Sequence, residues 1–539
     1  MVVDPEALAK YLNKPIKYTP DWKNINSFRL QDYIETATGE YFRRCKGPPL
    51  YDHQLRSLAM ALVEKQILLF LGMRTGKTRI ALEYASHLRK TRQWKGKALI
   101  IVPSPTVLDV WEEQILEYTK LRYYILRSTK ENDLLEAVEG KYDIIVVAWS
   151  SLQKLLTKKQ IHTKRGKVQI DSAGEAVMKL KVDVDTCAVL GTYFTMMIID
   201  EIHLCKTKDT LRYQIAEIVS RNHSYRLGLT GTPFGRHPLD IWPQAYLIDG
   251  GKALGGHPHF FNIAFSIVKY NHFSKFRKEL KFDDKKLGIL SNKLRPISIA
   301  YKLEDIREIN ELSRITELTM AGEQAALYKK AVEQQVTAII EEQKEGLPAR
   351  GINSFVRLRQ ISSGHVAFID NAGRSSLATL PSHAKLIWLR KAIASGMEDA
   401  PFVIFYEFTA SGQQIVNELR RAKLKVGWVY GEGKTNSEDI RNFQNGKLHG
   451  LVINSKSGGV GIDLWPADYV YFYESSVSPI VRAQAEKRPF GPKRGNRPVI
   501  LEDVIASKIE ERVYGFIKEG KALLDRTIHT KRELINWFS

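Results

Sequence analysis

The sequence predicts an α/β protein with two parallel-sheet lobes, a mainly helical region between them and a β-hairpin inserted into the first lobe. Two separate series of short apolar segments alternate with helical patterns, over residues 46–245 and 396–515. Such alternation is typical of parallel sheets. Residues 246–395 repeat no strand–loop–helix of this kind, and 539 residues are too many for one hydrophobic core.

The first series is organised around residues 66–78. Residues 66–71 are nearly all apolar, which predicts a buried strand, and a helix is expected from Lys77 onward. A turn between a strand and a helix N-terminus binds phosphate through its backbone N–H groups. We expect Lys77 to reach the β/γ-phosphates and Thr78 to ligate Mg²⁺. Leu71 replaces the usual first glycine of this pattern, and the expected nucleotide-binding residues are Gly72, Met73, Arg74, Thr75, Gly76, Lys77 and Thr78.

The composition favours an intracellular protein with a polyanionic partner. Lys and Arg exceed Asp and Glu by 81 − 60 = 21, which favours nucleic acid, although a merely basic soluble protein remains the alternative. No apolar run reaches the roughly 18 residues of a membrane helix, and no signal segment is seen. The spacing of Cys45, Cys187 and Cys205 fits neither a zinc site nor a disulfide framework, so we expect a cytoplasmic location.

Two segments of the first lobe have open roles. Residues 1–45 are expected to form a helical N-terminal extension of unknown role. Gln54 lies just ahead of the phosphate loop, where its amide can both donate to and accept from the edge of adenine, although an ordinary surface glutamine is the alternative.

Residues 156–189 follow the expected strands at 97–103 and 142–148 and precede the next expected strand. Their composition differs from that of the strands. Five basic residues and two glycines crowd residues 158–174, and alternating Val, Leu and Lys follow. This pattern predicts a β-hairpin insertion with a basic tip. The tip either contacts a nucleic acid duplex or is simply solvated.

An apolar strand at 195–199 ends in Asp200 and Glu201. Carboxylates at the end of a parallel strand are the expected form of a site for metal and water. We expect Asp200 to hold Mg²⁺, mostly through waters, and Glu201 to orient or deprotonate the attacking water. An Asp-Glu pair alone more often begins a helix. Its place about 120 residues after the phosphate loop favours the functional interpretation, and a further strand at 225–229 ends in a Thr-Gly-Thr-Pro turn.

The second series predicts a parallel sheet without a phosphate loop. Its expected strands are residues 402–405, 426–430, 451–453, 469–472 and 498–501, and the clearest helices before it are 328–340 and 355–361. A glycine-rich turn at 457–463 contains Gly461 and Asp463, and a helix carries Gln484 and Arg488. Residues 516–539 are expected to form a C-terminal helix and basic tail.

In this order the motifs of residues 50–520 resemble those of a superfamily-2 helicase, and most closely the Snf2-like branch of DNA translocases. Residues 50–56 resemble the glutamine motif, 73–78 the Snf2 phosphate loop, 200–203 the DExH box and 229–233 motif III. Lys206 and residues 358–365 resemble further Snf2 segments, 457–464 resembles motif V, and Gln484, Ala485 and Arg488 open motif VI. The resemblance implies two RecA-like lobes, ATP and Mg²⁺ as ligands, and DNA as a sequence-tolerant partner. It also suggests a compact protein of the bacteriophage type, in a bacterial or phage-infected cell.

Three positions depart from the family pattern. Arg74 stands where the family has glycine, Asp463 where Snf2 members often carry asparagine, and Gly491 where the second arginine of motif VI is expected. Arg488 is therefore the expected arginine finger. Either it faces the γ-phosphate alone, or Arg494 swings in from a loop with extra residues as the second arginine, and we favour the second alternative. Nucleotide contacts are also expected from Gly461 and Asp463, and a catalytic contribution from Gln484.

These residues together predict a DNA-dependent ATPase, a monomeric motor that moves along or remodels DNA, at forks or junctions in replication, recombination or repair. ATP would bind between the lobes, with Lys77, Thr78, Asp200 and Glu201 on one side and Arg488 on the other. Two alternatives remain open at this point: an ATP-gated DNA clamp with little hydrolysis, and an RNA-directed helicase. Strand separation, polarity and preferred DNA structure are not encoded in any motif that we identify.

Overall fold

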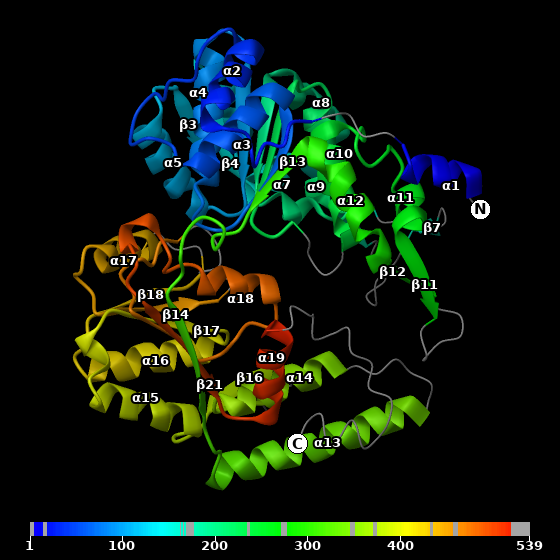
Figure 1. Ribbon diagram of the computed structural model, residues 1–539. Coiled ribbons are helices and arrows are strands. Elements are labelled where there is room, and N and C mark those ends of the chain that lie inside the picture. The colour runs from blue at the N-terminus through cyan, green and yellow to red at the C-terminus, as the bar shows by residue number, and fades with distance from the viewer. Residues whose placement is uncertain are drawn as a thin grey trace. The chain divides into compact units, whose positions relative to one another are not determined.

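A computed structural model describes residues 5–14, 19–161, 163–164, 167–168, 177–233, 238–270, 278–344, 351–369, 375–431, 435–455 and 462–518 (Figure 1). The chain divides into two compact units, Met1–Arg307 and Glu308–Ser539, called unit 1 and unit 2 below. Each unit is built on a parallel sheet, so the predicted α/β fold with two parallel-sheet lobes is confirmed. None of the helices in the described residues is both long and apolar enough to cross a membrane.

The sheet of unit 1 contains seven parallel strands. Its core strands are the apolar runs that the sequence predicts, buried on both faces because helices cover the sheet. In spatial order the strands are β13 (Ser298–Tyr301), β1 (Gln66–Leu71), β10 (Tyr225–Thr230), β9 (Phe194–Asp200), β2 (Lys97–Val102), β4 (Ile144–Ala148) and β3 (Tyr123–Leu126).

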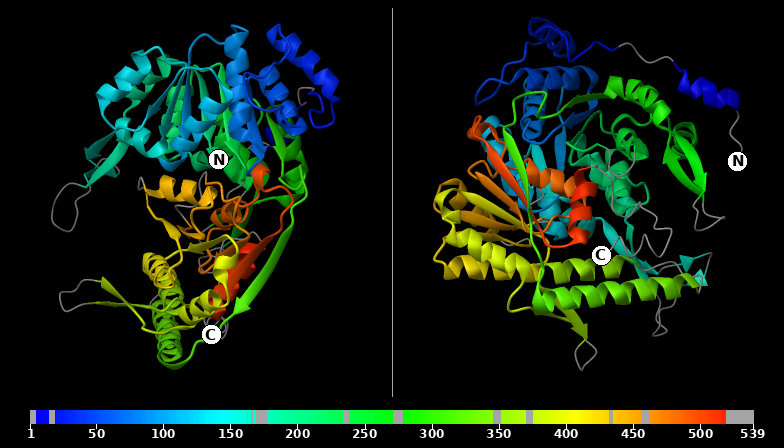
Figure 2. Two further views of the ribbon diagram at one scale, coloured as in Figure 1. Left: turned by 90° about the vertical axis from the view of Figure 1, so that its left-hand side faces the viewer. Right: turned by 60° about the horizontal axis from the view of Figure 1, so that its bottom comes forward.

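The helices of unit 1 form two groups on opposite sides of this sheet (Figures 1 and 2). One group contains α2 (Ser27–Thr38), α3 (Asp52–Glu64), α4 (Lys77–Lys90) and α5 (Thr106–Tyr118), and successive helices in it touch. The other contains α7 (Trp149–Leu155), α8 (Val184–Thr192), α9 (Leu211–Ser220) and α10 (Ile241–Asp249), joined through α9. The remaining helices are α1 (Pro5–Leu12), α6 (Glu131–Glu139), α11 (Pro258–Phe265) and α12 (Leu287–Leu294).

The predicted hairpin insertion is confirmed within the described residues. β5 (Thr157–Ile161) pairs antiparallel with β8 (Met178–Val182), and β6 (Thr163–Lys164) pairs with β7 (Lys167–Val168). The expected extent to residue 189 is wrong, because α8 begins at Val184. Its buried residues Cys187, Leu190 and Gly191 recur at helical spacing, and this face packs against α9. Most of the predicted tip lies outside the described residues.

The sheet of unit 2 contains six parallel strands. In spatial order they are β14 (Glu311–Glu317), β21 (Val499–Ile505), β20 (Tyr469–Phe472), β17 (Phe402–Tyr406), β19 (Gly450–Asn454) and β18 (Val426–Val429). β14 and β21 run side by side along the edge of the unit (Figures 1 and 2). The helices are α13 (Gly322–Lys344), α14 (Gly351–Ser362), α15 (Ala384–Ala394), α16 (Thr409–Arg421), α17 (Thr435–Gln444), α18 (Pro479–Glu486) and α19 (Lys508–Lys518).

The region 246–395, expected to be mainly helical, also supplies strands. Its helices α13 and α14 include the two helical segments that the sequence predicts. However, β13 forms one edge of the seven-stranded sheet and β14 one edge of the six-stranded sheet. Two antiparallel pairs also lie in this region, β11 (Ser266–Tyr270) with β12 (Lys278–Phe282) and β15 (His365–Ile369) with β16 (Ser375–Thr379).

Candidate active site

Three neighbouring strands of unit 1 end at the same level and bring the candidate residues together. In the register of the sheet, Phe70 of β1 lies beside Thr230 of β10, and Leu229 of β10 lies beside Asp200 of β9. Because the strands are parallel, the phosphate loop, the Asp200–Glu201 pair and the turn after Thr230 leave the sheet at one edge. This is the edge at which open α/β sheets bind ligands.

The phosphate loop has the backbone of an anion-binding turn. Gly76 is left-handed at φ 87° and so is Arg74 at φ 64°. Thr75 is buried, and its hydroxyl donates to the carbonyl of Gly72 at 2.8 Å. The Lys77 ammonium donates to the carbonyls of Leu71 at 2.9 Å and Gly72 at 3.1 Å. Lys77 thus lies folded over the loop, at the start of α4.

Two side chains of α3, His53 and Gln54, stabilise this loop at the carbonyl of Thr75. His53 Nε2 lies 2.8 Å from the Thr75 carbonyl and Gln54 Nε2 lies 3.1 Å from it. The other end of the Gln54 amide accepts from the Tyr51 backbone N–H at 3.0 Å. A Cβ on Gly76 would lie 2.1 Å from Gln54 Nε2, so any other residue there would have to displace the Gln54 amide. In this structure Gln54 supports the loop, and its contact with adenine stays a prediction.

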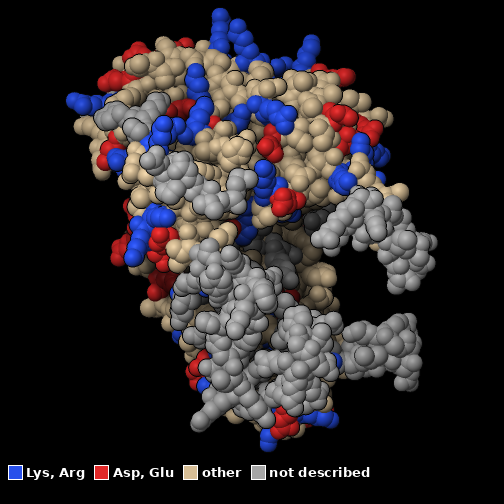
Figure 3. Space-filling view, turned by 90° about the vertical axis from the view of Figure 1, so that its right-hand side faces the viewer, with Lys and Arg blue, Asp and Glu red and all other residues tan. Residues whose placement is uncertain are grey.

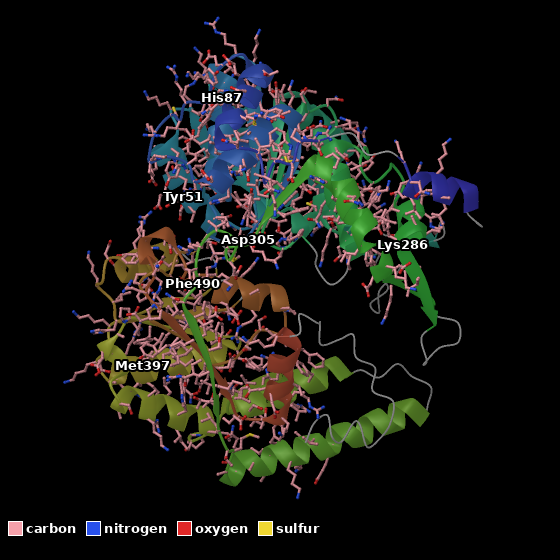
Figure 4. The ribbon with its side chains drawn as sticks, in the orientation of Figure 1. Tyr51, His87, Lys286, Asp305, Met397 and Phe490 are labelled. Carbon is pink, nitrogen blue, oxygen red and sulfur yellow. The ribbon has the colours of Figure 1, made fainter. Side chains whose placement is uncertain are left out.

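Tyr51, labelled in Figure 4, precedes α3 and is 58% exposed. Its ring stacks on that of His53, with 6.0 Å between centroids. Because the neighbouring His53 is bonded to the phosphate loop, Tyr51 presents an exposed aromatic face close to that loop. Burial lowers the pKa of His53, the largest effect on that group, so its imidazole is neutral at pH 7.

The two carboxylates are held by different partners. Asp200 Oδ2 accepts from the indole N–H of Trp111 at 3.1 Å, and Oδ1 accepts from the Glu201 backbone N–H at 3.0 Å. Glu201 Oε2 accepts from the Thr230 hydroxyl at 3.2 Å and lies 3.1 Å from His203 Nδ1. Glu201 is itself left-handed at φ 52°, a strained conformation for a residue with a side chain. The turn therefore aims the two carboxylates at different groups.

The pKa values of Asp200 and Glu201 are shifted in opposite directions. Burial and the charge of Glu201 raise the pKa of Asp200 to about 6. Burial also acts to raise the pKa of Glu201, but the hydrogen bond from His203 and the charge of Lys77 outweigh it and lower that pKa to about 2. The charge of Lys77 acts to lower the pKa of both carboxylates. Glu201 is ionised at neutral pH and is a strong hydrogen-bond acceptor rather than a strong base.

The donor set fits Mg²⁺ bound through few protein ligands. Thr78 is half-buried in the first turn of α4 and Asp200 is buried at the end of β9. The described residues contain no group of three or more His, Cys, Asp or Glu side chains able to hold a metal by themselves. One carboxylate, one hydroxyl and a nucleotide phosphate is the way Mg²⁺ usually binds in such sites.

In unit 2, Arg488 lies beside the end of the glycine-rich turn. Arg488 is buried, its Nη1 lies 3.4 Å from the Ile462 carbonyl, and its own carbonyl accepts from the Leu464 backbone N–H at 3.2 Å. Asp463 accepts from the Trp465 backbone N–H at 3.2 Å, and a Cβ on Gly491 would lie 3.3 Å from Asp463 Oδ1. The structure thus brings Arg488, Asp463 and Gly491 together. Gly461 lies outside the described residues.

Arg494 does not fit the role of a second finger. Its side chain is buried, and all five of its N–H donors point at acceptors of unit 2. These acceptors are the carbonyls of Trp465, Ala467, Arg497 and Pro498 and the carboxylate of Asp468. No donor remains for a phosphate, so the expectation that Arg494 replaces the missing arginine is corrected. Arg494 ties the loop after α18 to the start of β20 instead.

α18 carries Gln484, which is buried. The helix is held in place by Arg482, a residue that no sequence motif singled out. Arg482 is buried and pairs bidentately with Asp503 of β21, with 2.7 Å from Nη2 to Oδ2, and it also contacts Glu486 at 2.9 Å. Its guanidinium lies 3.2 Å from the centroid of the Phe472 ring. Through Arg482, α18 is anchored on two strands just ahead of Arg488.

Two known protein domains match this chain. Residues 53–365 match the SNF2-related domain, and residues 384–490 match the helicase conserved C-terminal domain. The chain belongs to the SNF2-related family. The first match alone spans more than half of the chain, and the predicted membership in the Snf2-like branch of superfamily 2 is confirmed.

Relatives of this SNF2-related protein share a fifth to a quarter of its residues. The ISWI chromatin-remodeling complex ATPase CHR11 of Arabidopsis thaliana is 23% identical, over 91% of this chain and 45% of its own length. The putative ATP-dependent helicase/translocase YwqA of Bacillus subtilis is 21% identical, over 87% of this chain and 46% of its own. The chain thus spans about half the length of these two relatives.

A solved structure, the Sulfolobus solfataricus SWI2/SNF2 ATPase core in complex with dsDNA, is similar with a TM-score of 0.38 and 21% identity. The similarity covers 89% of this chain and 92% of that chain.

Proposed function

We propose that this SNF2-related protein is an ATP-dependent DNA motor, a DNA-stimulated ATPase that converts hydrolysis into movement along DNA or its remodelling. The observation that carries the proposal is the cluster at one sheet edge. There Lys77, Asp200 and Glu201 come from two strand ends separated by the strand that ends in Thr230. The match of residues 53–365 to the SNF2-related domain supports the same function.

The residues of unit 1 then have distinct roles. The loop backbone and Lys77 bind the phosphates of ATP, and Thr78 and Asp200 hold Mg²⁺. When bound, Mg²⁺ supplies positive charge to the phosphoryl group being transferred. Glu201, ionised and fixed by Thr230 and His203, orients the attacking water by accepting a hydrogen bond from it. Tyr51 offers an aromatic face, and Gln54 an amide, on the base side of the loop.

Unit 2 contributes Arg488 as the arginine that stabilises charge on the γ-phosphate. An arginine in this role is worth roughly 10³–10⁵ in rate. Because Lys77 and Arg488 belong to different units, the proposed mechanism requires both units for hydrolysis, and this requirement would couple ATP turnover to movement on DNA. DNA is proposed as the partner because of the family and the net charge of +21, with contacts mainly to phosphates.

The decisive experiment measures steady-state ATP hydrolysis with duplex, single-stranded and forked DNA, and with RNA. We expect DNA to stimulate turnover, Lys77→Ala to abolish it, and DNA binding by that variant to stay near normal. Glu201→Gln should bind ATP and hydrolyse it at least 10²-fold more slowly. Full turnover in the Lys77→Ala variant would show that the site is elsewhere, and stimulation by RNA alone would replace DNA as the partner.

A second candidate is an ATP-gated DNA clamp that hydrolyses slowly. It is favoured by one observation: Gly491 occupies the place of the second arginine, and Arg494 is fully engaged within unit 2. A clamp would bind DNA tightly with ATP, yet show little turnover even with saturating DNA. The same ATPase measurement therefore separates the clamp from the motor.

A further inference from the structure

The β5–β8 ribbon of unit 1 has two chemically different faces. Directly opposed residues of an antiparallel pair share a face, and successive residues alternate between faces. One face is polar and carries Lys158, Gln160, Lys179 and Lys181. The other carries the apolar residues Ile161, Met178, Leu180 and Val182, together with Thr157 and Lys159. We call these the lysine face and the apolar face.

The lysine face is charged beyond what the ribbon itself can stabilise. Lys158 and Lys181 stand directly opposite each other, and Lys179 follows on the same face. Like charges opposed across two strands destabilise a ribbon. Lys158 forms an ion pair with Asp183 at 3.2 Å, and both Lys179 and Lys181 are exposed. A polyanion bound here would relieve the repulsion.

The apolar face begins in the core and continues into solvent. Val182 is 9% exposed and belongs to the core of unit 1. Beyond it, Leu180 is 54% exposed, and the opposed pair Met178 and Ile161 are 50% and 49% exposed. Three neighbouring aliphatic side chains half in water on a narrow ribbon are typical of a surface that contacts a partner.

The β5–β8 ribbon is more uniformly basic than the surface shown in Figure 3. On the face shown in Figure 3, Lys and Arg side chains are scattered among Asp and Glu rather than gathered in one patch. The β5–β8 ribbon, in contrast, holds four lysines and no acidic residue within its ten residues.

We propose that the β5–β8 ribbon binds nucleic acid at the boundary between duplex and single strand, with the lysine face on phosphates and the apolar face against the open base pair. This inference rests on the proposed DNA motor and names the element that gives it a preferred DNA structure. Lysines bind phosphates without regard to sequence. Leu, Ile and Met are among the side chains that proteins press against unstacked base steps, and a boundary offers an exposed base-pair face beside the phosphates of the duplex.

The two faces make different contributions, so they are tested by separate variants. Anisotropy of a fluorescent forked DNA, measured without nucleotide over a range of salt, reports both. Lys158→Gln, Lys179→Gln and Lys181→Gln together should weaken fork and blunt duplex alike. They should also lower the slope of log affinity against log salt by about two to three, one per lost phosphate contact.

Ile161→Thr, Met178→Thr and Leu180→Thr together keep the charge and the β-propensity of the ribbon. We expect this variant to lose about tenfold of the preference for forked over blunt duplex DNA, because the apolar contact with the open base pair is lost. Its salt slope should be unchanged. Lys281→Gln is the matched control, because Lys281 is an exposed lysine on a different ribbon of unit 1, β11–β12, and should change neither quantity.

The outcomes separate the ribbon from the motor. If the intact protein neither binds DNA nor hydrolyses ATP with it, the proposed function fails. If the intact protein does both, and the two ribbon variants bind fork and duplex like the Lys281→Gln control, only the ribbon proposal is overturned. A ribbon that binds a protein partner instead would give that second result. Circular dichroism and thermal melting verify that both variants are folded.

Discussion

The hydroxyl of Thr230 donates to Glu201 across two neighbouring strands, with 3.2 Å between Oγ1 and Oε2. Thr230 is fully buried at the end of β10, and His203 Nδ1 lies 3.0 Å from the same hydroxyl. The Thr232 backbone N–H also donates to it at 3.1 Å. One hydroxyl thus links the carboxylate expected to orient water with the turn that leaves the neighbouring strand.

Thr230→Val should slow hydrolysis without weakening nucleotide binding. The substitution keeps the side-chain shape and removes a hydrogen bond to a charged group, worth about 1.5–3 kcal/mol, so kcat should fall about ten- to a hundredfold. The KM for ATP should change little, because the phosphate loop is untouched. Thr230→Ser restores the hydroxyl and should recover most of the rate. Equal turnover in the Val and Ser variants would remove the hydroxyl from the mechanism.

Gly76→Ala should weaken ATP binding for two separable reasons. The backbone at φ 87° disfavours a Cβ by about 1–2 kcal/mol, and the new methyl would meet the Gln54 amide, which is pinned by the Tyr51 N–H and the Thr75 carbonyl. Adding Gln54→Ala removes the clash and leaves the backbone strain. Measured with a fluorescent ATP analogue, the double variant should bind more tightly than additive single effects predict. Strict additivity would show that the new methyl group does not clash with the Gln54 amide.

Substitution of Arg494 should lower the stability of the protein, whereas substitution of Arg488 should lower its turnover. Arg494→Ala removes the hydrogen bonds to several carbonyls and leaves Asp468 with the more exposed Arg497, 3.6 Å away. It should lower the free energy of unfolding by about 3 kcal/mol while the folded fraction keeps its kcat. Arg488→Lys keeps a positive charge and should lower kcat by about 10³-fold with little change in melting temperature. Denaturant titration and ATPase assays on both variants test this. Lost turnover in folded Arg494→Ala protein would restore that residue as a finger.

His87 should make the protein less stable in acid. Its imidazole is buried in α4 (Figure 4) with Nε2 2.9 Å from the Thr38 hydroxyl, and burial lowers its pKa to about 4. The unfolded chain binds the proton at about pH 6.5, so between pH 6.5 and 4 the unfolded state is protonated first. Stability present above pH 6.5 is therefore lost as the pH falls, by about 2 kcal/mol at pH 5.

His87→Gln, which can keep a hydrogen bond to Thr38, is the variant that checks this. Melting temperatures at pH 7 and pH 5 should differ less for His87→Gln than for the unaltered protein. His223, whose pKa burial also lowers to about 4, should contribute in the same direction. An identical acid shift in both proteins would show that His87 is already protonated, or exposed, in the native state.

The sequence predicts the central strands because burial on both faces demands continuous apolar runs, and β1, β2, β4, β9 and β17 are such runs. The edge strand β14 escapes this logic. Leu312 is 62% exposed and Ile315 is 43% exposed, so residues 311–317 need no apolar run and contain none. What places β14 is its register with β21, almost 190 residues later, which no local pattern reveals.

The candidate site, like the fold, could be predicted from the sequence only in part. Lys77, Asp200 and Glu201 follow strands, and the rule that parallel strands end at one edge is enough to bring them together. The partner of Asp200 was not predicted, because a tryptophan at position 111 looks like an ordinary core residue until its indole N–H is seen on the carboxylate. Arg494 was misassigned for the converse reason: spacing within a motif says nothing about which carbonyls surround a guanidinium.

The sheets of the two units share no strand, although β13 and β14 are separated only by residues 302–310. Every backbone ladder that we describe therefore closes on one side of the bond between Arg307 and Glu308. A polypeptide cut there yields two pieces that each contain every strand of one of the two parallel sheets, which suits expression from two plasmids and segmental isotope labelling. Ligation of the pieces would then reveal what the covalent tether itself adds to turnover.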